Sequence, residues 1–102
     1  MAKTKAQILD DMQGFIGRYG GSYKDWYVGT SNDPKGQLFF GHGFRKTDLG
    51  LYRQAGSELQ AAEVAEFFTG MGAKGDDGVK KNADFVYAFR LAAHTKPGAA
   101  RR

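Results

Sequence analysis

Two capping boxes divide this chain and limit what it can fold into. A capping box pairs a Ser or Thr with a Glu or Gln three residues later and marks the start of a helix. The chain carries it twice, as Thr4 with Gln7 and as Ser57 with Gln60. Apolar residues at helical period follow each box, and glycines follow each apolar run. The sequence therefore predicts helices over residues 5–19 and 58–71.

Three further segments have the character of strands, at residues 26–31, 49–55 and 84–91. In the last of them Phe85, Tyr87, Phe89 and Leu91 share one face, and Val86, Ala88 and Arg90 share the other. The order of elements predicts an α+β fold, with a small three-stranded, mainly antiparallel sheet covered by the two main helices. We expect one domain over residues 1–94 and a flexible basic tail over residues 95–102.

The second helix carries an apolar stripe that we expect to pack inward. Its members are Val64, Phe67, Phe68 and Met71, at spacings i, i+3, i+4 and i+7. Glu63 and Glu66 lie three residues apart on the same helix. They are either solvated surface residues or partners in a metal site, although hard cations need more ligands than one helix supplies.

Charge and composition narrow the classes of function. The formal net charge is +4, but five basic residues lie in the terminal segments, which leaves ten basic against eleven acidic residues in the body. Basic ends attract phosphate backbones, and they are also ordinary solubilising ends. The absence of cysteine excludes disulfides and thiolate metal sites. We find no signal peptide and no apolar run of the roughly 18 residues that span a bilayer, so we expect a cytoplasmic protein without a membrane partner.

Two glycine-rich segments are candidate functional loops. Residues 72–83 follow a helix and precede a strand, and they lack the Lys-Ser/Thr ending of a P-loop, so we predict a connecting loop. His42 lies between Gly41 and Gly43, which favours exposure, and imidazole titrates near neutrality. It is either a functional group or a loop histidine that is hydrogen-bonded to backbone.

The segment from Trp26 to Leu38 carries the most specific motif. Its sequence, WYVGTSNDPKGQL, is typical of a strand that breaks at Gly29 and passes through a polar turn. A short helix over residues 34–41 would follow, with Asp33 as its cap and Pro34 at its first position.

This motif resembles the second half of the signature of the GIY-YIG nuclease superfamily, in particular a small branch with the pattern W-Y-V-G-I-[TS]-N-D-P-x-R-R-L-F-x-x-H. The resemblance extends over roughly residues 25–90. It includes His42, the strand motif Tyr52-Arg53-Gln54-Ala55, the helix motif from Ala61 to Phe68, the glycines of the 72–83 loop, and the closing V-Y-A-F strand from Val86 to Phe89.

The resemblance implies a GIY-YIG-like fold and a metal-dependent phosphodiester chemistry. In such nucleases a metal ion and a guanidinium group offset the charge that develops on the phosphate. Carried over by position, Tyr27 matches a catalytic tyrosine of these nucleases, and His42 matches the histidine of their catalytic site. The arginine position is Gln37, which cannot form a charged bidentate clamp, and the metal glutamate falls on Ala65.

These departures favour a degenerate, non-catalytic domain that binds a nucleic acid or a protein and needs no cofactor. Its residual cleft would include Tyr27, Gln37, His42 and Arg53. One alternative is a Mg²⁺-dependent endonuclease that uses Tyr27 and His42 as catalytic residues and Glu66 as a metal ligand. The other is a structural or protein-interaction module without a ligand site, which an exposed aromatic face would indicate.

Overall fold

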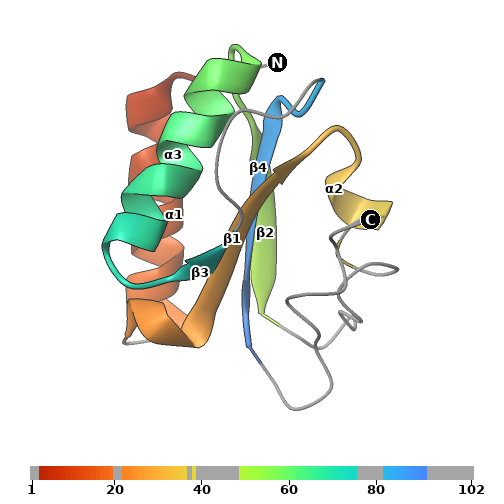
Figure 1. Ribbon diagram of the computed structural model, residues 1–102. Helices are drawn as coiled ribbons and strands as arrows, with labels where there is room; N and C mark the ends of the chain where they lie inside the picture. The colour runs from red at the N-terminus through yellow and green to blue at the C-terminus, as the bar shows by residue number, and fades with distance from the viewer. Residues whose placement is uncertain (1–2, 20–21, 37, 39–48, 76–81, 92–102) are drawn as a thin grey trace.

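Helices and strands are interleaved along the part of the chain that the computed structural model describes, residues 3–19, 22–36, 38, 49–75 and 82–91 (Figure 1). In chain order the elements are α1 (Lys5–Tyr19), the 3-10 helix η1 (Tyr23–Asp25), β1 (Trp26–Ser31), α2 (Pro34–Gly36), β2 (Gly50–Gln54), α3 (Glu58–Gly70), β3 (Lys74–Gly75) and β4 (Phe85–Arg90). The α+β class is confirmed. The two main helices and the three predicted strands begin and end within one residue of their predicted positions.

The first capping box forms as predicted, and the second forms with its glutamine bound to the residue before the N-cap. Thr4 Oγ1 accepts a hydrogen bond from the Gln7 backbone N–H at 3.2 Å, and Gln7 Oε1 accepts one from the Thr4 N–H at 2.9 Å. At α3, Ser57 Oγ accepts from the Gln60 N–H at 3.1 Å, and Gln60 Oε1 reaches the Gly56 N–H at 3.3 Å. These bonds satisfy donors that the first turn of a helix leaves without backbone partners, so each start is fixed by local sequence.

The start of α2 is also capped as predicted. Asp33 Oδ1 accepts a hydrogen bond from the Gly36 N–H at 3.2 Å, and Ser31 Oγ accepts one from the Asp33 N–H at 2.9 Å. The predicted short helix over 34–41 is described only in its first turn. Gln37 and His42 lie outside the described residues, as does the predicted tail over 95–102.

The sheet has four strands where the sequence predicted three. Its order is β2-β4-β1-β3, in which β4 pairs antiparallel with both β1 and β2, and β3 pairs parallel with β1. The mainly antiparallel three-stranded prediction is therefore corrected to a four-stranded mixed sheet. The added strand lies within residues 72–83, which we expected to be a loop. A strand of two residues has too few positions to show an alternating pattern.

Gly75 is what allows this added strand to approach β1. A Cβ at Gly75 would lie 2.1 Å from the carbonyl oxygen of Val28 and 2.8 Å from Cγ2 of Thr69. No side chain fits between the β1 backbone and α3, so a glycine is required for the close approach.

The sheet separates two clusters of different composition. The helices α1 and α3 lie together on one side of the sheet (Figure 1), over a cluster rich in aliphatic and small residues. This cluster contains Ile8, Met12, Ile16, Trp26, Val28, Ala55, Ala61, Val64, Ala65, Phe68, Ala73, Val86 and Ala88. The other side, here called the aromatic face, carries Tyr27, Leu38, Tyr87 and Phe89, with Tyr52 and Leu91 packed against them. The alternation predicted for the last strand is confirmed.

The inward face of α3 differs from the predicted stripe. Val64 and Phe68 are buried as expected, but Phe67 is 38% exposed and Met71 is 52% exposed. The alanines Ala61 and Ala65 take their place in the core. Small side chains let a helix lie close to a sheet, so the face with two alanines packs inward and the bulkier residues turn outward. The prediction that Phe67 and Met71 belong to the core is wrong.

Candidate functional site

Tyr27, which we expected in a catalytic site or a residual cleft, is packed within the aromatic face. Its side chain is 3% exposed, and its ring stacks on Phe89 with centroids 5.3 Å apart and on Tyr87 with centroids 6.2 Å apart. Gly29 makes room for this packing, because a Cβ there would lie 2.7 Å from the hydroxyl oxygen of Tyr87. The ring of Tyr27 therefore contributes to a packed aromatic cluster.

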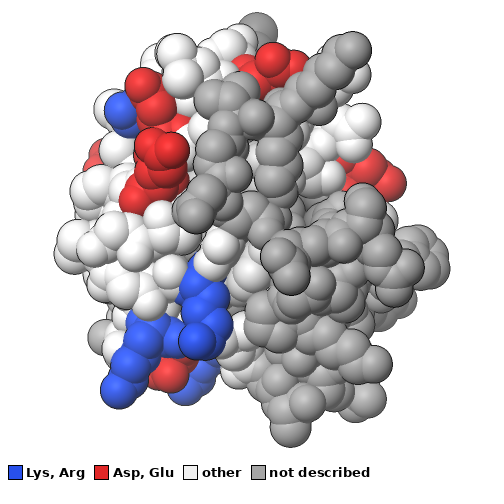
Figure 2. Space-filling model, viewed as in Figure 1, with Lys and Arg blue, Asp and Glu red and all other residues white. Residues whose placement is uncertain are grey.

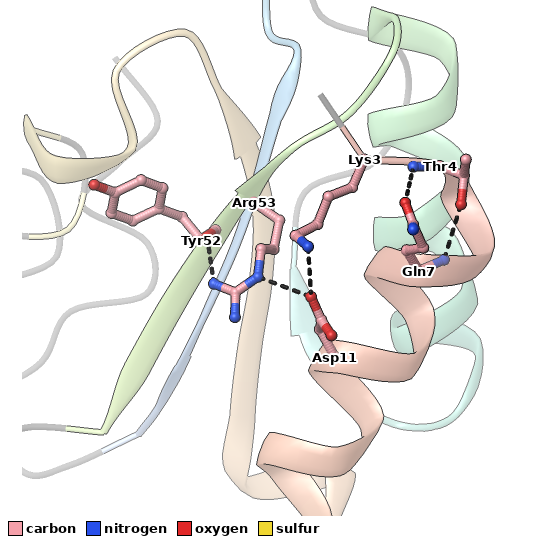
Figure 3. A network of polar contacts seen from close by, with 6 residues as sticks. All are labelled: Lys3, Thr4, Gln7, Asp11, Tyr52 and Arg53. Carbon is pink, nitrogen blue, oxygen red and sulfur yellow. Dashed lines mark hydrogen bonds and ion pairs between the residues drawn. The ribbon is translucent and has the colours of Figure 1, made fainter. Parts of the chain in front are cut away.

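Arg53, the other described residue of the expected cleft, belongs to a polar network here called the clasp, formed by Lys3, Asp11 and Arg53 (Figure 3). Arg53 Nε donates a hydrogen bond to Asp11 Oδ2 at 3.0 Å, and Lys3 Nζ lies 3.6 Å from the same oxygen. Arg53 Nη1 also donates to the carbonyl oxygen of Tyr52 at 2.8 Å. The clasp joins β2 to α1 and gives Arg53 a structural role.

The clasp changes the acidity of Asp11. The hydrogen bond from Arg53 holds the pKa of the Asp11 carboxyl below its usual value of 3.8, and the nearby charge of Lys3 acts in the same direction. Partial burial opposes these effects by disfavouring the charged form. Asp11 is therefore ionised at neutral pH and holds both cations in place.

The structure does not bring Tyr27 and Arg53 together. In the sheet Tyr27 pairs with Phe89, which lies on the aromatic face, whereas Arg53 pairs with Val86, which lies in the cluster under the helices. Figure 3 shows Tyr52 and Arg53 extending to opposite sides of β2. Because successive residues of a strand point to opposite faces, the expected cleft cannot include both side chains.

The remaining candidates give no metal site among the described residues. Glu66 is exposed on α3, the helix that covers the face opposite Tyr27. Ala65, at the position of the metal glutamate, is 2% exposed and packs in the core. No group of three or more His, Cys, Asp or Glu residues that could hold a metal ion occurs within the described ranges.

A different surface gathers exposed charge. Four exposed basic residues from four elements, here called the basic end, are Arg18 of α1, Lys24 of η1, Lys74 of β3 and Arg90 of β4. Arg90 lies opposite Trp26 at the start of β1, and Lys74 lies opposite Tyr27, the next residue. Lys24 precedes Trp26 by two residues. The register of the sheet therefore places these three residues around the start of β1, with Lys74 at a position of the aromatic face and Arg90 at a position of the face under the helices.

Tyr19 links Arg18 to the other members of the basic end. Arg90 Nη1 donates a hydrogen bond to the carbonyl oxygen of Tyr19 at 3.2 Å, and the Arg18 guanidinium carbon lies 5.7 Å from the centre of the Tyr19 ring. The last turn of a helix carries partial negative charge, which favours cations there. The end of α1 therefore holds the Arg18 guanidinium over the exposed Tyr19 ring and the Arg90 guanidinium at the Tyr19 backbone.

Among the described residues, basic side chains gather at one end of the fold, although the body of the sequence is nearly neutral. On the face that Figure 2 shows, most of the visible Lys and Arg atoms gather at the lower left around one acidic group, and most of the visible Asp and Glu atoms lie higher. Within the described parts of residues 18–25, 71–75 and 88–91, four residues are basic and Asp25 alone is acidic. A local excess of positive charge attracts anions even where the total charge is small.

Sequence reasoning missed the basic end because its members are scattered along the chain. Arg18 and Lys24 are separated by Gly20-Gly21, and Lys74 and Arg90 lie in segments that show no basic run. Lys74 could have been assigned to the basic end only by predicting the parallel pairing of β3 with β1, and the sequence did not predict that pairing. The net charge of the body sums the basic end together with acidic residues elsewhere, so it does not reveal a local excess of positive charge.

Comparisons with protein-family models, with curated proteins and with solved structures found no match to this chain. Within the described ranges, neither α1 nor α3 combines the length and the apolar character that a bilayer-crossing helix needs.

Proposed function

We propose that this chain is a non-catalytic nucleic-acid-binding domain, a degenerate relative of the GIY-YIG nucleases, that contacts phosphate groups through the basic end in the cytoplasm. The observation that carries the proposal is the gathering of Arg18, Lys24, Lys74 and Arg90, from four separate elements, at the end of the molecule where β1 begins. Exposed lysines and arginines that gather on one face are the electrostatic footprint of a nucleic-acid-binding protein.

The availability of these cations supports the proposal. Among the described residues, ion pairs involve Lys3, Lys5 and Arg53, and none involves a member of the basic end. A cation without a carboxylate partner can exchange its counterions for phosphates, and the release of those counterions favours binding. Four such groups offer a surface that recognises backbone phosphates without reading sequence.

Residues at the positions of the nuclease site argue against the nuclease alternative. Gln37 and Ala65 stand at the arginine and glutamate positions, and Ala65 packs in the core. Tyr27 and Glu66 lie on opposite sides of the sheet, so a single metal ion cannot join them. A Mg²⁺-dependent reaction through Tyr27, His42 and Glu66 therefore has no support from the described geometry.

The proposal is tested by matched charge reversals. We expect Lys24→Glu to weaken binding to a fluorescently labelled 20-nucleotide DNA strand by roughly tenfold at 0.1 M salt, since one phosphate contact releases about one counterion. Lys35→Glu is the control, because Lys35 is exposed on α2 and lies outside the basic end. Fluorescence anisotropy measures both affinities.

Three outcomes contradict the proposal. Equal losses in the two variants mean that only the total charge matters. Loss of binding on deletion of residues 95–102, with Lys24→Glu harmless, moves the contact to the basic tail. If the wild-type chain binds neither DNA nor RNA at low salt, a protein partner becomes the better explanation of this surface.

A further inference from the structure

Tyr19 presents an aromatic ring within the basic end. Its side chain is 43% exposed, which is high for a large apolar residue. The ring packs on Phe15 with centroids 4.9 Å apart and an interplanar angle of 55°. Phe15 in turn meets the buried ring of Trp26 edge-on at 5.7 Å. Phe15 therefore connects the Tyr19 ring to the core by ring packing. Because this packing already restricts the Tyr19 side chain, little conformational freedom is lost when a ligand contacts it.

The other large apolar side chains that are exposed in the described part of the chain do not share this setting. Leu59, Phe67 and Met71 are exposed on or just after α3. Phe67 is also an aromatic ring, and it packs edge-on against its neighbour Phe68, but Arg18 and Arg90 contact Tyr19 and not Phe67. Within the described ranges, Tyr19 is thus the exposed ring that has one guanidinium group over its face, that of Arg18, and a second at its backbone, that of Arg90.

We propose that Tyr19 is a stacking platform for a nucleobase, and that the basic end consequently prefers single-stranded to duplex nucleic acid. This inference rests on the proposed function. A single strand exposes the faces of its bases, whereas a duplex hides them in its own stack. Proteins that bind single strands combine a positively charged surface with aromatic rings on which bases stack, and Arg18, Arg90 and Tyr19 reproduce that combination at one helix end.

The test separates the contribution of the bases from that of the phosphates. Full-length protein is titrated with three labelled 20-nucleotide DNA probes: a single strand, its duplex, and an abasic strand that keeps every phosphate. We expect the wild type to bind the single strand most tightly. Tyr19→Ala should lose about five- to a hundredfold in affinity for that strand, the usual effect of removing one stacking ring, and nothing for the abasic strand.

Further variants distinguish the loss of base stacking from a folding defect. Tyr19→Phe keeps the flat ring and should bind the single strand as the wild type does. Tyr19→Leu keeps an apolar contact with Phe15 but has no flat ring, so it should share the loss of Tyr19→Ala. Phe67→Ala removes an exposed ring outside the basic end and should leave the affinity unchanged. Thermal melting of each variant checks that the fold is retained.

The outcomes distinguish this inference from the proposed function. The stacking inference is overturned if Tyr19→Leu binds the single strand as the wild type does. It is also overturned if Tyr19→Leu loses as much affinity for the abasic strand as for the normal strand. It is also overturned if the wild type binds duplex and single strand equally. In each of these cases a loss caused by Lys24→Glu still supports phosphate binding by the basic end, so the two ideas fail separately.

Discussion

The clasp and the basic end use the same kinds of side chain in opposite ways. In the clasp, Lys3 and Arg53 share the carboxylate of Asp11, and each of the three side chains is less than half exposed. In the basic end the cations are exposed, and none forms an ion pair with another described residue. The difference shows that the partner of a cation, more than its residue type, decides whether it stabilises the fold or stays available to a ligand.

One helix joins these two regions. Asp11 in the middle of α1 anchors β2, while Arg18 and Tyr19 at its end contribute to the basic end. The buried residues Ile8, Met12 and Ile16 pack α1 against the sheet. The position of the stacking ring therefore depends on the same packing that holds the clasp.

The contrast between a packed and an exposed side chain is largest at two adjacent phenylalanines of α3. We expect Phe68→Ala to destabilise the fold by about 3–5 kcal/mol, because Phe68 is fully buried. Phe67→Ala should cost less than about 1 kcal/mol, as its ring is partly exposed and packs mainly on Phe68. Urea unfolding of both variants measures the difference. Equal costs would mean that the inward face of α3 is assigned wrongly.

The salt dependence of binding provides the sharpest contrast between the clasp and the basic end. Each phosphate contact to a single strand contributes about 0.7 to the slope of log affinity against log salt. Replacing Arg18, Lys24 and Lys74 together by Gln should therefore reduce this slope by about 2. Arg53→Gln removes a cation from the clasp and should leave the slope unchanged. A reduced slope for Arg53→Gln would erase the distinction between the two regions.

Acid should weaken the clasp and leave the basic end unaffected. Since folding lowers the pKa of Asp11 below 3.8, its contribution to stability is complete above that value and is lost as the pH falls through the lowered pKa. At neutral pH we expect Asp11→Asn to cost at most about 1 kcal/mol, because the pair is partly exposed. That cost should shrink in acid when unfolding is followed below pH 4. Lys24→Gln, the control, should show no such trend, and a cost for Asp11→Asn that grows in acid would contradict the clasp.

Local signals made most of the fold predictable. The capping boxes give the starts of α1 and α3, and alternation gives the faces of β4, because these features depend on neighbours along the chain. β3 was not predictable, since its two residues pair with β1 only where Gly75 permits close approach. The inward face of α3 was ambiguous because alanine is common both in cores and on surfaces.

The candidate site was less predictable than the fold. The resemblance to nucleases proposed that Tyr27 and Arg53 share a cleft, but the register of β4 with β1 and β2 places them on opposite faces. The basic end depends on the same register and on a helix end, and neither leaves a contiguous motif. Surface charge is a property of the assembled chain, so a count along the sequence could not locate it.

The parallel pairing of β3 has a consequence for how the chain meets a ligand. Because Lys74 reaches its neighbours only when β3 pairs with β1, the surface it completes is absent from the unfolded chain and from any short peptide. An anion that bridges Lys74 and Lys24 therefore binds the native state alone, and by mass action it shifts the folding equilibrium toward that state. Ligand concentration and the population of the folded protein are thermodynamically linked through a strand of two residues.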